Sequence, residues 1–235
     1  MKPIGVIGGI GPESTIDYYR AMIAAYRERQ PDGSYPAILI NSIDAQAMLG
    51  GLMTGELDRV ADSLVAELER LARAGAGLAI LAANSPHIVF DQVQRHSPLP
   101  LVSIVEATRD EALRLGLKRL ALFGTRFTMQ GRFYQDVFAA AGLAIVVPDE
   151  AAQAYIHEKY MTELVNGVLA AETRERLLAI VAATKARDGV DAVILGGTEL
   201  PLLLRDASIA GVPVLDTTGL HVAAIVQRLR HAPAG

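Results

Sequence analysis

Short apolar runs alternate with longer amphipathic segments along this chain. Runs of two to four apolar residues between polar or glycine-rich stretches are typical of strands that a parallel sheet buries on both faces. Between two runs, residues 56–73 place leucine, valine and alanine at helical spacing, and Gly75 is placed to end that helix. The alternation predicts βαβ units. The apolar runs are residues 6–7, 37–40, 78–81, 120–123, 144–147 and 192–195.

The chain also resembles itself. "KPIGVIGGIGPESTIDYY" from Lys2 is matched by "KRLALFGTRFTMQGRFY" from Lys118, and "GAGLAILAANSPH" from Gly75 by "GVDAVILGGTELP" from Gly189. "LPLVSI" and "VPVLDT" then align Pro100 with Pro213. Two unrelated doubly wound domains would share some of these features, but three blocks in the same order at nearly constant spacing favour an internal repeat.

An α/β fold with two similar lobes follows from this repeat. We expect the two parallel sheets to be related by a pseudo-two-fold axis, with a ligand cleft between the carboxyl ends of their strands. The predicted N-terminal lobe comprises residues 1–98 plus 212–235, and the predicted C-terminal lobe residues 99–211. Positions 83 and 197 would face each other across the cleft.

Composition narrows the partners and the chemistry. The 235 residues are 51% hydrophobic and 20% charged, with a net charge of -4, so the chain lacks the basic field that nucleic acids or anionic membranes attract. No apolar stretch is long enough to span a bilayer, and we expect a cytoplasmic protein. The chain has no cysteine, which excludes disulfides, thiolate metal sites and thiol nucleophiles or bases. No metal-ligand spacing relates His96, His157, His221 and His231, so no metal is expected.

Glycines and small polar residues follow several of the predicted strands. Gly9 and Gly11 belong to a loop whose backbone N–H groups could hold a carboxylate or phosphate before a helix that Pro12 opens; a tight turn without a ligand is the alternative. Its counterpart in the second half contains Thr125 and Thr128. The first loop is not a dinucleotide fingerprint, because Ser14 stands where a third glycine would be needed.

The loops after the apolar runs 78–81 and 192–195 are the strongest candidates for chemistry. Asn84 and Ser85 offer hydrogen-bond donors to a carboxylate, although Ser85 before Pro86 also resembles a helix N-cap. His87 could act as an acid or base, or could be a structural hydrogen-bonding residue. Thr198 and Glu199 occupy the corresponding places, and Glu199 is either catalytic or a carboxylate that braces the loop.

Taken together, these motifs resemble the aspartate/glutamate racemase family. The resemblance implies two Rossmann-like lobes, an amino-acid or small carboxylate substrate between them, no cofactor and a homodimer. In that family one cysteine removes the α-proton and an opposed cysteine delivers a proton to the other face, so the thiols must be poised by their surroundings. The motifs that carry the resemblance are "GVIGGIGPESTIDYYR", "AANSPH", "FGTRFTMQGRFY", "ILGGTELPLL" and "VPVLDTTGLH".

The sequence departs from this family at the two decisive positions. The cysteines fall on Ala83 and Gly197, and neither a methyl group nor a hydrogen atom can exchange a proton with a substrate. The resemblance places carboxylate binding on Asn84, Ser85, Thr125 and Thr198, and less directly on Thr128, Gly9 and Gly11. The segment "NSIDAQAMLGGLMTGE" has no basic residue to pair with an acidic substrate side chain.

Three functions are compatible with this pattern. The first is an amino-acid racemase or epimerase whose thiols were removed or replaced. The second is another isomerase, lyase or decarboxylase of a small carboxylate, with Glu199, His87 or a water molecule supplying the proton. The third is a non-catalytic protein that binds a small acid.

Overall fold

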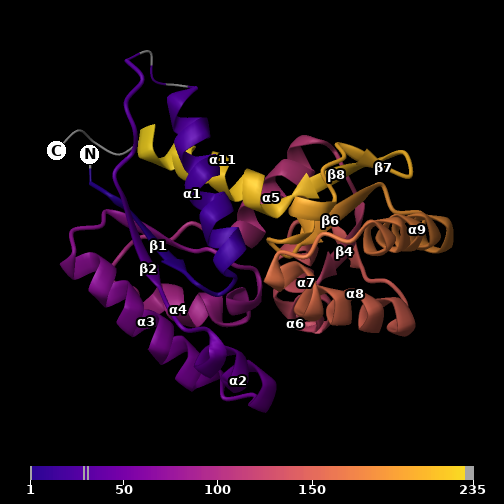
Figure 1. Ribbon diagram of the computed structural model, residues 1–235, viewed down its shortest axis with the longest axis horizontal. Helices are drawn as coiled ribbons and strands as arrows, with labels where there is room; N and C mark the ends of the chain where they lie inside the picture. The colour runs from indigo at the N-terminus through magenta and orange to yellow at the C-terminus, as the bar shows by residue number, and fades with distance from the viewer. Residues whose placement is uncertain (1, 29, 31, 231–235) are drawn as a thin grey trace. The chain divides into compact units, whose positions relative to one another are not determined.

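The computed structural model describes residues 2–28, 30 and 32–230, and its contacts divide the chain into two compact units. The first unit contains the residues up to Ser103 together with those from His221 onward, and the second comprises Ile104–Leu220. Both units are α/β, as the alternating pattern predicts (Figure 1). The two-fold relation between the lobes and the ligand cleft stay predictions.

Three parallel strands form the sheet of the first unit, in the order β2-β1-β3. Leu101 extends this sheet through an isolated parallel bridge to Ala79 of β3. Tyr18 and Met22 of α1 pack with Val222 and Ile225 of α11 in one buried cluster, and Figure 1 shows the two helices close together. The elements are β1 (Ile4–Gly8), α1 (Pro12–Arg27), β2 (Ile38–Ser42), α2 (Gln46–Thr54), α3 (Leu57–Arg73), β3 (Leu78–Leu81), the 3-10 helix η1 (Ser85–Val89), α4 (Phe90–His96) and α11 (Thr217–Arg230).

Five strands form the sheet of the second unit, in the order β5-β4-β6-β8-β7, with only β7 antiparallel to its neighbour among the described strands. Helices cover the sheet through two buried clusters. The elements are α5 (Ile104–Arg114), β4 (Arg119–Gly124), α6 (Arg126–Gln130), α7 (Arg132–Ala139), β5 (Ala144–Val146), α8 (Glu150–Thr162), the 3-10 helix η2 (Leu164–Asn166), α9 (Ala171–Asp188), β6 (Ala192–Gly196), α10 (Leu200–Leu203), β7 (Ser208–Ile209) and β8 (Val212–Asp216).

The strand orders of the two sheets correspond to each other. β2, β1, β3 and the Leu101 bridge follow one another in space as β5, β4, β6 and β8 do. By strand order, the segment around Pro100 is the equivalent of the β8 segment around Pro213. The sequence alignment of the two halves pairs the same two segments. The shared topology therefore supports the internal repeat.

The lobe boundaries fall later than the sequence indicates. The expected changes of lobe at 98/99 and 211/212 precede the observed ones, which come after Ser103 and after Leu220. The reason is strand pairing: Leu101 pairs with β3, and β8 pairs with β6, so each segment stays with the sheet before it. Only the helix that follows crosses over, because α5 packs in the second unit and most of α11 packs in the first.

Candidate functional site

The glycine loop of the first unit is a tight turn whose hydrogen bonds are partly internal. Gly9 has φ +80, and a Cβ atom there would lie 2.3 Å from the carbonyl oxygen of Ile43, so the position requires glycine. The Gly9 N–H donates to Thr15 Oγ1 at 2.9 Å, and the Thr15 hydroxyl donates to the Gly11 carbonyl at 3.0 Å. The Gly9 N–H is therefore already hydrogen-bonded to Thr15 of α1. For this donor, a tight turn without a ligand is favoured over anion binding.

The loop after β3 is buried from Ala82 to His87. Ala83, Asn84 and Ser85 are 6%, 3% and 8% exposed. The 3-10 helix begins at Ser85, so Asn84 and not Ser85 holds the N-cap position, and it forms no side-chain capping hydrogen bond. The cap interpretation of Ser85 is thus corrected. These polar side chains lie at the carboxyl end of β3, beside the loop that follows β1.

His87 is held as a neutral imidazole against the backbone of the same loop. Its Nδ1 lies 3.0 Å from the Ala83 carbonyl oxygen, and because a carbonyl only accepts, Nδ1 carries the proton. The ring stacks on Phe90 with centroids 4.8 Å apart. Burial, with the nearby His221, lowers the pKa of His87 to about 3. An imidazole with so low a pKa is a weak base at neutral pH, which favours the structural interpretation.

A second buried histidine extends this polar cluster. His221 Nε2 donates to the Val102 carbonyl oxygen at 2.9 Å, which leaves Nδ1 to accept the hydroxyl proton of Tyr18, also at 2.9 Å. The rings of His87 and His221 have centroids 6.4 Å apart. Burial lowers the pKa of His221 to about 4. No local pattern predicts this role of His221, because its partner Tyr18 lies 203 residues away along the chain.

In the second unit, Thr125 and Thr128 interact with each other. Thr125 is the N-cap of α6 and accepts the Thr128 N–H at 3.4 Å, while the two hydroxyl oxygens lie 3.3 Å apart. Both side chains are buried. The structure therefore gives this pair a capping role beside the carboxylate-binding role that the resemblance implies.

The loop after β6 is closed by a tyrosine from α8. Glu199 is 2% exposed, and its Oε2 accepts hydrogen bonds from the hydroxyls of Tyr160 and Thr198, the latter at 3.0 Å. Burial, followed by the charge of Glu199, raises the pKa of Tyr160 well above its usual value. A Cβ atom at Gly197 would lie 2.3 Å from Tyr160 Cε2. The loop is thus braced by Glu199 and has no room for a side chain at 197.

The structure brings the candidate residues together as two sets, one in each unit. Gly9, Gly11, Ala83, Asn84, Ser85 and His87 follow the neighbouring strands β1 and β3, while Thr125, Thr128, Gly197, Thr198 and Glu199 follow the neighbouring strands β4 and β6. Carboxyl ends of parallel strands are where α/β proteins bind ligands. Sequence reasoning missed Tyr160, because its partner Glu199 is 39 residues away and helical spacing alone marks it as a packing residue.

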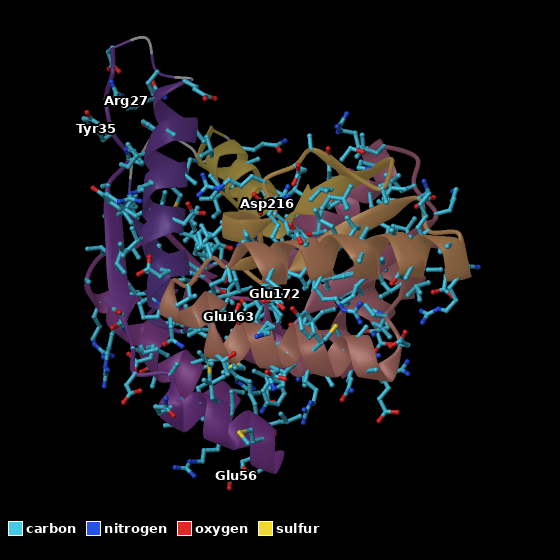
Figure 2. The ribbon with its side chains drawn as sticks, turned by 45° about the vertical axis from the view of Figure 1, so that its right-hand side comes forward. Arg27, Tyr35, Glu56, Glu163, Glu172 and Asp216 are labelled. Carbon is cyan, nitrogen blue, oxygen red and sulfur yellow. The ribbon has the colours of Figure 1, made fainter. Side chains whose placement is uncertain are left out.

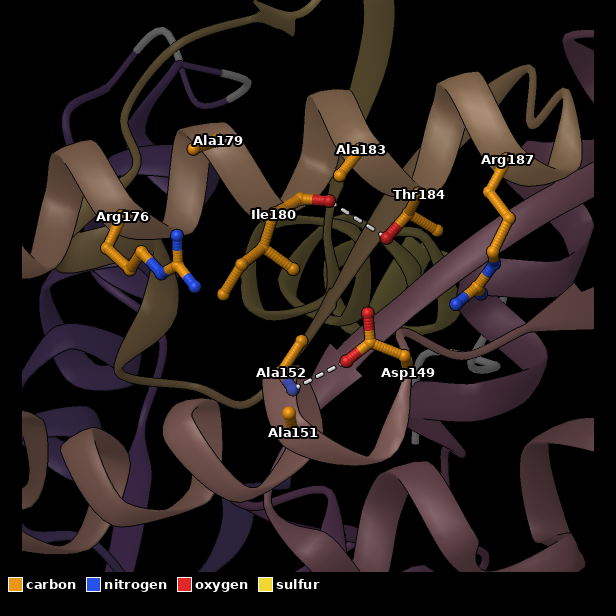
Figure 3. Close-up of a pocket in the computed structure, with 9 residues that line it drawn as sticks. All are labelled: Asp149, Ala151, Ala152, Arg176, Ala179, Ile180, Ala183, Thr184 and Arg187. Carbon is orange, nitrogen blue, oxygen red and sulfur yellow. Dashed lines mark hydrogen bonds between the residues drawn. The ribbon is translucent and has the colours of Figure 1, made fainter.

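A pocket of about 420 Å³ lies elsewhere in the second unit, between the start of α8 and α9 (Figure 3). Asp149 caps α8 by accepting the Ala152 N–H at 2.9 Å, and Arg187 donates to the Val147 carbonyl oxygen at 2.7 Å. None of the sequence-predicted site residues lines this pocket. The lining residues are Asp149, Ala151, Ala152, Arg176, Ala179, Ile180, Ala183, Thr184 and Arg187.

The described part of the chain has neither a candidate metal-ion cluster nor a helix suited to a membrane. Over residues 2–28, 30 and 32–230, no cluster of three or more histidine, aspartate or glutamate side chains could hold a metal ion. Within the same residues, no helix has the length and apolar character that crossing a membrane requires.

Comparison with known proteins identifies the family. A sequence model described as Asp/Glu/hydantoin racemase matches residues 7–225. This chain belongs to the Asp/Glu/hydantoin racemase family. The family resemblance that the loop motifs indicate is thereby confirmed.

Individual family members agree with this assignment. A broad-specificity amino-acid racemase, RacX, from Bacillus subtilis is 26% identical over 175 residues, which cover 72% of this chain and 70% of RacX. An aspartate racemase homologue from Pyrococcus horikoshii is 34% identical, with a TM-score of 0.84 over 98% of this chain and all of the other. A candidate Asp/Glu racemase from Yersinia pestis is 29% identical, with a TM-score of 0.88 over 98% of this chain and all of the other. The two-lobed α/β fold is the fold of these two solved structures.

This member of the Asp/Glu/hydantoin racemase family has no cysteine in its 235 residues. Its composition is consistent with the replacement of the catalytic thiols that the family resemblance implies.

Proposed function

We propose that this protein binds a small amino acid or carboxylic acid through the loops at the carboxyl ends of its strands and does not racemise it. One observation carries the proposal: the chain belongs to a racemase family and has no cysteine, with alanine and glycine at the two positions where the resemblance implies the thiols. Binding would use the hydrogen-bonding side chains of Asn84, Ser85, Thr125 and Thr198, with Thr128 and the Gly9 to Gly11 loop beside them. We expect no cofactor, and a homodimer.

The other acid–base candidates offer little chemistry in place of thiols. His87 is neutral, with a pKa of about 3, and its Nδ1 proton is directed at a backbone carbonyl. Tyr160 retains its proton because its pKa is raised, and it directs that proton at Glu199. A proton abstracted from a carbon atom needs an acceptor with a pKa near the working pH. This comparison favours a non-catalytic binding protein.

Titration calorimetry tests the binding part of the proposal. The native protein would be titrated at pH 7 with L- and D-aspartate, L- and D-glutamate, alanine, succinate and malate. We expect saturable heat with at least one of these acids, and at least a tenfold weaker affinity in Asn84→Ala, since each lost hydrogen bond to a charged ligand costs about 1.5–3 kcal/mol. Gln94→Ala, on an exposed position of α4, is the control. No binding of any acid would refute the proposal.

A second candidate function keeps proton transfer but assigns it to Glu199. The observation that favours it is the fixed position of this buried carboxylate, which accepts two hydroxyl hydrogen bonds. The enzyme would then be an isomerase, lyase or decarboxylase of a small carboxylate. The native protein should in that case convert a substrate, and Glu199→Gln should abolish turnover. Unchanged turnover in Glu199→Gln and in His87→Ala would exclude both side chains as the proton carrier.

A further inference from the structure

Position 197 is occupied from outside its own loop. An ideal Cβ atom built on Gly197 would lie 2.3 Å from Tyr160 Cε2 and 3.0 Å from both Cζ and the hydroxyl oxygen. These atoms form one edge of the phenol ring. Non-bonded carbon atoms pack at about 3.5–4.0 Å, so the ring fills the volume that any side chain at 197 would enter.

The tyrosine ring is held at both ends, so it cannot simply move aside. Its hydroxyl donates to the buried Glu199, and the side chain is 6% exposed within the cluster that covers one face of the sheet. The helix that carries it is fixed near its C-terminus by Glu163, which pairs with Lys159 at 2.6 Å and accepts the Thr173 hydroxyl of α9 at 2.5 Å. Figure 2 shows Glu163 close to Glu172, at the start of α9.

The geometry points to Tyr160 as the residue that determines what position 197 can hold. We propose that Tyr160 takes the place of a side chain at 197 and, held by Glu199, closes the carboxyl end of β6 against any reactive group there. The loss of the thiol in this lobe is therefore built into the packing of α8 on β6. Restoring a cysteine at 197 requires a change at Tyr160 as well.

The interpretation as a closed reactive position rests on the proposed function, whereas the packing stands independently of any ligand. Gly197→Ala tests the packing, because it adds only the atom in question. The same substitution at Gly50, where nothing lies within 4 Å of the new Cβ atom, is the control for a methyl group added without a clash. Because Gly50 lies inside α2, where alanine is favoured over glycine, this control should raise Tm slightly. Both substitutions would be placed in the native chain, in Tyr160→Phe, which keeps the ring, and in Tyr160→Leu, which removes the contacting edge.

Thermal unfolding gives the readout. We expect Gly197→Ala to lower Tm by ~5–10 °C relative to Gly50→Ala in the native and Tyr160→Phe chains, as overpacking does, and by less than ~2 °C in Tyr160→Leu. Failure of Gly197→Ala to fold, with recovery in Gly197→Ala/Tyr160→Leu, would support the proposal equally. An effect of Gly197→Ala no larger than that of Gly50→Ala, or a cost that persists in Tyr160→Leu, would overturn it.

A second measurement decides the matter if Tyr160→Leu does not fold. In a chain with labelled tyrosine rings, Gly197→Ala should shift the NMR resonances of Tyr160 and leave most of the other six tyrosines in place. Unmoved Tyr160 resonances would overturn the proposal. Loss of ligand binding with the stability results intact would instead refute the proposed function alone.

Discussion

The loops that hold Ala83 and Gly197 follow the corresponding strands β3 and β6 of the two sheets, yet these two positions are packed in different ways. Ala83 keeps a Cβ atom, and its carbonyl accepts a hydrogen bond from His87 of the same loop. Gly197 has no side chain, and Tyr160 of α8 fills the volume that a Cβ atom there would need. The first position is contacted from within its own loop, whereas the second is contacted by a residue of another helix. Corresponding positions in a repeat can therefore differ in how much room they leave for a larger side chain.

The largest expected difference between the loops is their response to acid. His87 and His221 have folded pKa values of about 3 and about 4, below the ordinary value of 6.5, so the unfolded chain takes up protons first as pH falls. The contribution of these two histidines to the free energy of unfolding is fully present above about pH 6.5 and is lost as the pH falls toward 3–4. At ~1.4 kcal/mol for each unit by which a pKa is lowered, the total loss is several kcal/mol.

Denaturant unfolding between pH 8 and pH 4 measures this loss. In His87→Gln the free energy of unfolding should decrease less as the pH falls, because one of the two titrating groups is gone. His96→Gln, at the exposed end of α4, is the control and should show the same decrease as the native chain. Equal decreases in the native chain and in His87→Gln would contradict the assignment of buried neutral imidazole to the first loop.

The second loop should respond most to the loss of the tyrosine hydroxyl. Tyr160→Phe keeps the ring beside Gly197 and removes one of the hydrogen bonds to the buried Glu199 carboxylate. We expect a loss of about 1.5–3 kcal/mol in the free energy of unfolding, since hydrogen bonds to charged groups contribute that much. Tyr19→Phe, which removes a hydroxyl from a side chain 47% exposed, should cost far less. Similar costs in both variants would show that the hydroxyl does not brace the loop.

A smaller effect distinguishes the two loops that precede helices α1 and α6. The N-cap of α1, Gly11, makes no side-chain capping hydrogen bond, whereas Thr125 caps α6. Thr125→Ala should therefore lower the free energy of unfolding by about 1 kcal/mol. Thr54→Ala, at the exposed end of α2, controls for the removal of a threonine. If the two variants unfold at the same denaturant concentration, capping by Thr125 contributes nothing and its role is left to ligand binding.

The sequence predicts where strands and helices lie better than it predicts which of them pair with one another. Residues 78–81 form a strand with the expected bounds, and Gly75, with φ +95, lies just beyond the end of α3. These features depend on local chemistry: apolar runs that a sheet must bury, and a backbone conformation that glycine adopts easily. The predicted lobe boundaries precede those of the structure, because pairing between β8 and β6 is a long-range contact that no local pattern reveals.

The candidate site was predictable in its loops and not in its contacts. Asn84, Ser85, Thr198 and Glu199 follow strands as expected, and the interpretation of Glu199 as a brace agrees with its hydrogen bonds. The contact of Tyr160 with Gly197 could not be read from the sequence. The glycine at 197 indicates only that a neighbouring group could occupy the space of a side chain. The structure shows that this group is Tyr160 of helix α8.

The central claim is that this member of the Asp/Glu/hydantoin racemase family binds a small acid without moving its α-proton. NMR in D₂O measures it most directly: the native protein is incubated with each amino acid in turn, and deuterium at the α-carbon is followed over days. We expect no incorporation above the protein-free rate, including with the acid that calorimetry shows to bind best. Incorporation at α-carbon by the cysteine-free native chain, lost in Glu199→Gln, would contradict it.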